Sequence, residues 1–310
     1  MKRSDFLRNA ALVSGAALTG NALQASEQKA QNLFTQQKGK TFKLNYAPHQ
    51  GMFQDSAGKN FLDEIQYFYD LGFRAIEDNG YLGRSVEEQD KIGNLLAKLG
   101  MTMGVFVVDG GQNWMTSLAT GKPEFLDHFV KTCQRSVEAA KRCNAKWLTV
   151  VPGFYERKLP WGNQFANIVQ AMRKGAEIFE PHNLIMVLET LSDTPDLFLQ
   201  QTHETYAVCK AVNSPSCKIL YDIYHMQRTE GDLLVNIDRC WDEIAYVQIG
   251  DNPGRKEPTT GEINYKNVFA HLYKKGYRGV MGMEHGKSKG GKAGEEALVA
   301  AYREVDSFSV

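Results

Sequence analysis

Three carboxylates and one amide in the second half of the chain each end a short apolar run: Glu189, Asp222, Gln248 and Glu284. If these side chains were buried together without a cation, the carboxylates would repel one another, and two or more would have to take up protons. A divalent metal ion removes that conflict. Because all the ligand atoms are oxygens, the set favours a hard ion, Mg²⁺ or Mn²⁺, over zinc.

The elements that must position these residues follow from the alternation of the chain after residue 41. Helical patterns, several of them ending in glycine, separate eight apolar runs. The runs span residues 42–48, 73–78, 102–108, 146–152, 184–190, 218–224, 244–250 and 279–285. Alternating strands and helices predict a parallel sheet, and eight such units match a (β/α)8 TIM barrel of the α/β class. The alternative is an open doubly wound sheet, but no GxGxxG sequence follows the first run.

A barrel explains why charged residues lie within apolar runs. Side chains alternate between the two faces of a strand, so Asp222 points into the barrel with Leu220, while Tyr221 faces the helices. The same alternation turns the other three polar residues inward. Barrel enzymes carry their chemistry at the C-terminal ends of the strands, so we expect the four side chains to converge at the barrel mouth. For each residue taken alone, the alternative is a loop cap or an ion pair with Lys or Arg.

Three further residues are candidates for substrate contact. Arg255 lies in the dense segment "QIGDNPGRKEPTTGEINY", where its planar fork suits a carboxylate or a phosphate. A bond from Arg255 to loop carbonyls or to Glu257 is the alternative. His225 follows Asp222 by three residues, and His49 ends the first run as a weaker candidate of the same kind.

Composition limits the kind of partner. Lys and Arg together number 36, as do Asp and Glu, so no net charge draws the chain to nucleic acid or to an anionic membrane. The five cysteines have no zinc-ligand spacing and are interpreted as small hydrophobic residues. Trp114 and Trp161 either wall a pocket or simply pack there. We therefore expect a small-molecule partner, a keto acid or a sugar, and leave a homo-oligomer open.

The N-terminus has the pattern of an export signal over residues 1–26. Lys2 and Arg3 precede a weakly apolar segment, and small residues follow near Ala22 and Ala25. Ser4 stands where a twin-arginine signal has its second arginine. The apolar segment is too short and too polar to span a membrane. Residues 27–40 form a polar linker to a single domain at 41–310, and we expect export, to the periplasm, with a cytoplasmic protein as the alternative.

Three segments, "YDIYHMQRTEGDL", "VQIGDNPGRKEPTTGEINY" and "GMEHG", resemble the hydroxypyruvate isomerase family. This family lies within the xylose-isomerase-like superfamily of sugar isomerases and epimerases. The resemblance is strong over residues 217–286 and general over 42–190. It implies a TIM barrel with one Mg²⁺ or Mn²⁺ on the same four residues, two glutamates that move protons, and a histidine at position 225 that touches substrate oxygens. The chain departs from the family in "LETLSD", in "EHGK" and at Thr259, where the family has glycine.

Together these observations predict a metal-dependent isomerase that interconverts a small hydroxy-carbonyl compound through an enediolate. Glu189 and Glu284 would remove and return the proton, and the nominal reaction is hydroxypyruvate to tartronate semialdehyde. The first alternative is a sugar or keto-sugar epimerase. A non-catalytic periplasmic sugar-binding protein is another, although it needs no pair of glutamates on a metal. A three-zinc nuclease of the same architecture would require many more histidines.

Overall fold

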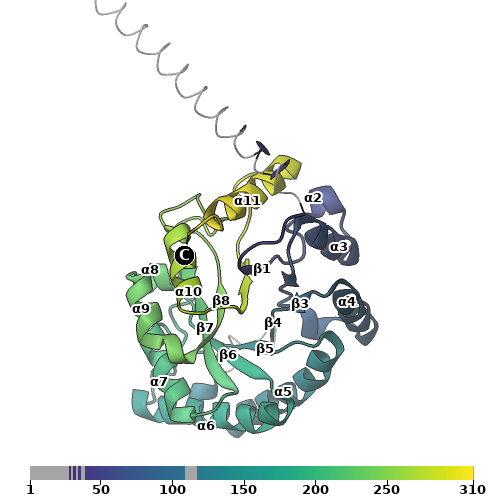
Figure 1. Cartoon of the computed structure of the whole chain (residues 1–310). Coiled ribbons are helices and arrows are strands. Elements are labelled where there is room, and N and C mark those ends of the chain that lie inside the picture. Colours follow the sequence, from purple (N-terminus) through teal and green to yellow (C-terminus); the bar gives the residue numbers. More distant parts are fainter. Residues whose placement is uncertain (1–27, 29–30, 33, 36–38, 109–116, 310) are drawn as a thin grey trace, which may run out of the picture.

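The computed structural model describes residues 28, 31–32, 34–35, 39–108 and 117–309. The expected export segment and Trp114 lie outside this part of the chain. Figure 1 shows the helices following one another around the outside of a curled central sheet. This arrangement is the predicted TIM barrel, and it makes residues far apart in sequence meet at one mouth.

The strands are short and pair only in parallel. They are β1 Asn45–Ala47, β2 Ala75–Ile76, β3 Thr102–Met103, β4 Val105–Val107, β5 Trp147–Val150, β6 Ile185–Glu189, β7 Cys217–Asp222, β8 Ile244–Gln248 and β9 Val280–Gly282. Seven of them form a sheet in the order β1-β9-β8-β7-β6-β5-β4, and β2 pairs with β3. A parallel bridge between His49 and Glu77 continues the ring from β1 to β2. The third predicted run is split into β3 and β4 at Gly104.

Helices cover the outside of the ring. They are α2 Gln54–Ala57, α3 Phe61–Leu71, α4 Val86–Leu99, α5 Pro123–Cys143, α6 Trp161–Phe179, α7 Thr202–Val212, α8 Ile223–Thr229, α9 Leu233–Cys240, α10 Tyr265–Lys274 and α11 Gly291–Val305. Single 3₁₀ turns occur at η1 Tyr81–Gly83, η3 Leu118–Thr120, η4 Glu180–His182 and η5 Trp241–Glu243. Local signals set several ends: α4 begins at a capping box between Ser85 and Glu88, and α3 ends at the left-handed Gly72. Among the described residues no helix has the length and apolar character needed to cross a bilayer.

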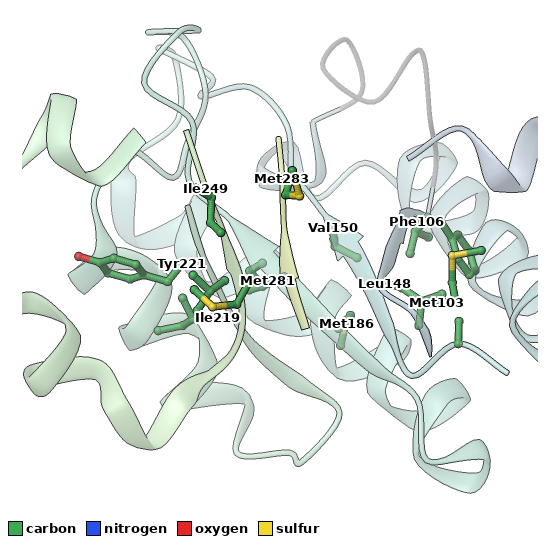
Figure 2. Packing of buried hydrophobic residues seen from close by; sticks show 14 of the residues in the cluster. Met103, Phe106, Leu148, Val150, Met186, Ile219, Tyr221, Ile249, Met281 and Met283 are labelled. Carbon is green, nitrogen blue, oxygen red and sulfur yellow. The ribbon is translucent and has the colours of Figure 1, made fainter. Parts of the chain in front are cut away.

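The core has two parts, as the alternation of side chains predicts. Ile219 and Tyr221 pack between the sheet and the helices, where Figure 2 shows them beside Met281. Leu220 instead belongs to a cluster inside the barrel with Val187, Tyr246 and others. All five cysteines are buried, which agrees with their interpretation as small hydrophobic residues. The inward faces of the strands therefore end in the polar residues of the barrel mouth.

The predicted run 218–224 is wrong at its end. β7 stops at Asp222, and α8 starts at Ile223 rather than continuing the strand through Tyr224. The cause is a helix cap, because Asp222 Oδ1 accepts hydrogen bonds from the backbone N–H groups of Tyr224 at 2.7 Å and His225 at 3.2 Å. The turn brings His225 back toward the end of its own strand.

The loop after β8 contains two residues in left-handed backbone, Arg255 with φ 48° and Thr259 with φ 77°. A β-branched residue rarely adopts positive φ, because its Cβ substituents collide with the backbone there. Thr259 is the position at which the resembling family has glycine, the residue that adopts this conformation without strain. The conformation of the loop that carries Arg255 therefore includes backbone strain at Thr259, which lowers stability locally.

Replacing Thr259 by glycine should raise the free energy of unfolding by about 1 kcal/mol, because the strain at positive φ is relieved. Thr260→Gly is the matched control. Thr260 is absent from the set of positive-φ residues, and its hydroxyl donates to the Glu257 carbonyl at 2.7 Å, so its replacement should lower stability. Urea unfolding measures both. A Thr259→Gly protein less stable than the wild type would contradict the assignment of strain.

Candidate active site

The four polar residues come together at the C-terminal ends of neighbouring strands. Glu189, Asp222 and Gln248 are the last residues of β6, β7 and β8, and Glu284 follows β9 by two residues. Strand register sets Asp222 beside Gln248, and Gln248 beside Gly282. Asp222 and Gln248 are 1% exposed and Glu189 is 5% exposed. Three members of the set predicted from sequence are therefore buried at the strand ends, and Glu284 is partly buried.

Ligand atoms of Glu189, Asp222, His225 and Glu284 all lie within 4.8 Å of one another. Several polar atoms of the cluster are buried without a hydrogen-bond partner, namely Glu189 Oε1, Gln248 Oε1 and His225 Nε2. Such orphaned groups are costly unless something binds them. Burial, and next the charge of Asp222, raises the pKa of Glu189 well above its usual value. Burial, followed by Glu189, does the same to the pKa of Glu284. Unpaired oxygens and crowded carboxylates fit a divalent cation.

Asp222 divides its two oxygens between structure and site. Oδ1 caps α8, whereas Oδ2 faces the cluster, 3.3 Å from Arg255 Nη2 and 3.7 Å from His225 Nε2. The helix cap thereby fixes which oxygen is left for a ligand.

His225 is fully buried, and its neighbours define which ring nitrogen carries the proton. Nδ1 accepts a hydrogen bond from the backbone N–H of Ser192 at 3.1 Å and lies 2.8 Å from the Ser192 hydroxyl. A backbone N–H can only donate, so Nδ1 is unprotonated and the neutral ring carries its proton on Nε2. Burial lowers the pKa of His225, which favours the neutral ring. Nε2 is thus a donor that faces the carboxylates, which suits contact with a substrate oxygen better than coordination of a metal.

Among the described residues, Arg255 is the positively charged side chain that contacts this cluster. Its Nη2 donates to Glu284 Oε2 at 2.6 Å and to Asp222 Oδ2 at 3.3 Å, and its guanidinium lies 4.9 Å from the centre of the Tyr224 ring. The ion pair that was the alternative for each carboxylate therefore exists for two of them. One guanidinium cannot balance three carboxylates, so the cluster keeps a deficit of positive charge.

His49 and Trp161 lie differently from the other candidates. The ring nitrogens of His49 lie 2.9 Å from the Gln50 carbonyl and 3.3 Å from the His285 carbonyl, and His49 is not among the clustered ligand atoms. Its contact with substrate stays a prediction. Trp161 begins α6, is 47% exposed and stacks on Phe165 and Phe198.

Sequence reasoning missed Glu77, which follows β2 and is 1% exposed. It accepts hydrogen bonds from the Tyr246 hydroxyl and from Gln248 Nε2, each at 2.9 Å. Burial raises the pKa of Glu77 to about 7. Its position two residues after the inward-facing Ala75 is the same signal that identified the other four. Asn79, whose Nδ2 donates to Glu284 Oε1 at 3.1 Å, was also missed.

Known proteins resemble the chain at three levels. A family described as a xylose isomerase-like TIM barrel matches residues 65–304. Hydroxypyruvate isomerase of Escherichia coli is 36% identical over 122 residues, which are 39% of this chain and 47% of that enzyme, so the match spans about half the length of that relative. A 2-oxo-tetronate isomerase of Cupriavidus necator is 26% identical over 241 residues, 76% of this chain and 90% of that protein.

Among solved structures, the crystal structure of an AP endonuclease of family 2 from Brucella melitensis has a TM-score of 0.71 at 25% identity, over 81% of this chain and 95% of that one. The barrel, its polar mouth and the length of the family match lead to one assignment: the chain belongs to the xylose isomerase-like TIM barrel family.

Proposed function

We propose that this protein is a metal-dependent isomerase that moves a proton between adjacent carbons of a small hydroxy-carbonyl compound, nominally converting hydroxypyruvate to tartronate semialdehyde. The observation that carries the proposal is the cluster of three carboxylates and one histidine whose ligand atoms lie within 4.8 Å of one another at the barrel mouth. The sequence similarity of the chain to the E. coli and C. necator isomerases supports the same class of reaction. The runner-up is a sugar or keto-sugar epimerase.

Glu189 and Glu284 are the bases in this proposal. They come from β6 and from the segment after β9, three places apart in the order of the sheet, so they approach a bound substrate from different sides. One carboxylate removes a proton from the hydroxyl-bearing carbon next to the carbonyl, and the other delivers a proton to the former carbonyl carbon. The hydroxyl proton passes to the former carbonyl oxygen, so that carbonyl and hydroxyl exchange places. A divalent ion, Mg²⁺ or Mn²⁺, held by Glu189, Asp222, Gln248 and Glu284 would supply positive charge for the substrate oxygens and keep the carboxylate that removes the proton ionised.

His225 and Arg255 orient the substrate. The Nε2–H of His225 donates to a substrate oxygen while Ser192 holds the other side of the ring. The Arg255 side chain is 29% exposed at the mouth, where its fork can bind a carboxylate. A keto acid has such a group and a neutral ketose does not, so Arg255 favours a keto acid over a sugar. A three-zinc nuclease fits poorly, because His225 is the one histidine in the clustered set found among the described residues.

The wild-type protein should bind about one Mn²⁺, and Asp222→Asn should weaken that binding at least about tenfold by removing a charged ligand. Asparagine keeps an oxygen to cap α8, so its amide nitrogen must face the cluster. His225→Gln is the contrasting variant and should keep the affinity within about threefold, because Nε2 already carries a proton. Isothermal titration calorimetry measures all three. A wild-type protein that binds no divalent ion after reloading would end the metal proposal.

With Mn²⁺ present, Glu189→Gln and Glu284→Gln should each lower hydroxypyruvate isomerisation by roughly 10²–10⁴-fold, because each removes one base. The variant that lacks the returning base still removes and restores the first proton, so it should continue to exchange that proton with solvent deuterium. Proton NMR follows both reactions.

Glu262→Gln, an exposed carboxylate on the loop after β8, is the control and should keep activity. If both base variants turn over within about tenfold of a wild type that is active, the two-glutamate mechanism is wrong. Activity on ketoses alone would favour the epimerase instead.

We also propose that the protein is exported to the periplasm and that its mature form starts after Ala22 or Ala25, because residues 1–26 have the composition of a cleaved signal. N-terminal sequencing of the protein recovered from its native cells should find a start at Leu23 or Ser26 in the envelope fraction. An intact Met1 on cytoplasmic protein would refute export.

A further inference from the structure

Glu77 is a buried carboxylate for which the proposed reaction has no role. It lies inside the barrel just after β2, and its backbone N–H donates to the Pro48 carbonyl at 3.0 Å. Its Oε2 accepts from the Tyr246 hydroxyl and its Oε1 accepts from Gln248 Nε2, each at 2.9 Å. Tyr246 and Gln248 are themselves 0% and 1% exposed. The three side chains form one hydrogen-bonded unit beneath the acidic cluster.

The bond to Glu77 decides which end of the Gln248 amide is presented to the cluster. The two ends of an amide have nearly the same size, so only hydrogen bonding distinguishes one orientation from the other. A carboxylate oxygen requires a donor, and therefore the NH₂ group of Gln248 faces Glu77. The carbonyl Oε1 then points away from Glu77, and it is one of the buried atoms without a partner. The reverse orientation would bring two oxygens together and turn an NH₂ group toward any bound cation.

Two glycines make room for this unit: Gly282 at the end of β9 and Gly104 between β3 and β4. A Cβ added at Gly282 would lie 1.8 Å from Glu77 Oε2 and 3.1 Å from Gln248 Cγ. A Cβ added at Gly104 would lie 2.4 Å from the Tyr246 hydroxyl oxygen. Glu77 is thus confined by packing as well as by its two donors, so it can act as a fixed reference for the amide.

We propose that Glu77 is a positioning residue that holds Gln248 with its carbonyl oxygen turned toward the cation site. The inference rests on the proposed function only in requiring that a divalent ion binds, and it does not depend on the substrate. Glu77 itself is not a ligand of the ion in this proposal. Its effect passes through one side chain, Gln248, and that restriction makes the proposal testable by ion affinity without any assay of activity.

Mn²⁺ affinity, measured by isothermal titration calorimetry, separates orientation from charge. Glu77→Met keeps the volume but removes the acceptor, and it should weaken binding about 10–100-fold, as loss of a ligand's partner typically does. Glu77→Gln removes the charge but can still offer an oxygen to Gln248, while its NH₂ donates to the Tyr246 oxygen. It should bind within about threefold of the wild type. Equal losses in both variants would show that Glu77 acts through its charge and would overturn the proposal.

A double-mutant cycle tests whether the effect passes through Gln248. Gln248→Met removes the ligand, so adding Glu77→Met to it should cost less than about threefold in affinity. Full additivity of the two losses, or an unchanged affinity in Glu77→Met alone, overturns the assignment. In the latter case the wild type still binds the ion, so the proposed function survives. A wild type that binds no ion overturns both.

Thermal unfolding of each variant controls for folding. If Glu77→Met does not fold, a crystal structure of the wild type grown with Mn²⁺ decides the question. Contact between the ion and the end of the Gln248 amide that faces away from Glu77 supports the proposal, and a Gln248 side chain that has left Glu77 overturns it.

Discussion

Repulsion among carboxylates buried at one end of the barrel is the constraint on which the rest of the site depends. Each carboxylate meets it in a different way. Asp222 uses one oxygen to cap α8, Glu77 accepts from a hydroxyl and an amide, and Glu284 is paired with Arg255. Glu189 Oε1 is buried and has no hydrogen-bond partner. The unmet demand for positive charge therefore falls at the point where the four strand ends meet, and this concentrates the chemistry there.

The barrel meets that demand with features spread over many elements. Parallel register brings the ends of β6 to β9 side by side, and helices packed outside leave the inward faces free to carry polar residues. The loop after β8 holds Arg255 in left-handed backbone, with its N–H bonded to the Asp251 carbonyl at 2.7 Å. Strained backbone of this kind persists where surrounding contacts fix it, and it is common at functional sites. The packed outer layers thus support a mouth in which the buried carboxylates and the left-handed backbone would each be unfavourable alone.

Much of the site could be predicted because strand alternation is a local property. Asp222 with Leu220, and Gln248 with Tyr246, follow the period of two whatever the rest of the chain does. Glu77 obeys the same rule, two residues after Ala75, and the same signal could have identified it. Ser192 was out of reach, since it lies in the loop after β6 and its backbone N–H meets a ring in α8, 33 residues along the chain. The end of β7 was also out of reach, because the apolar run continues through Tyr224 while the cap at Asp222 turns the chain into a helix.

The double use of Asp222 has a consequence for engineering. One carboxylate both starts α8 and faces the site, so a change at this position alters the path of the backbone as well as the chemistry. A residue that shapes the mouth from a loop, such as Asn79, has no such second role at a strand–helix junction. To make this barrel accept another substrate, an engineer should keep Asp222 and randomise the loop positions.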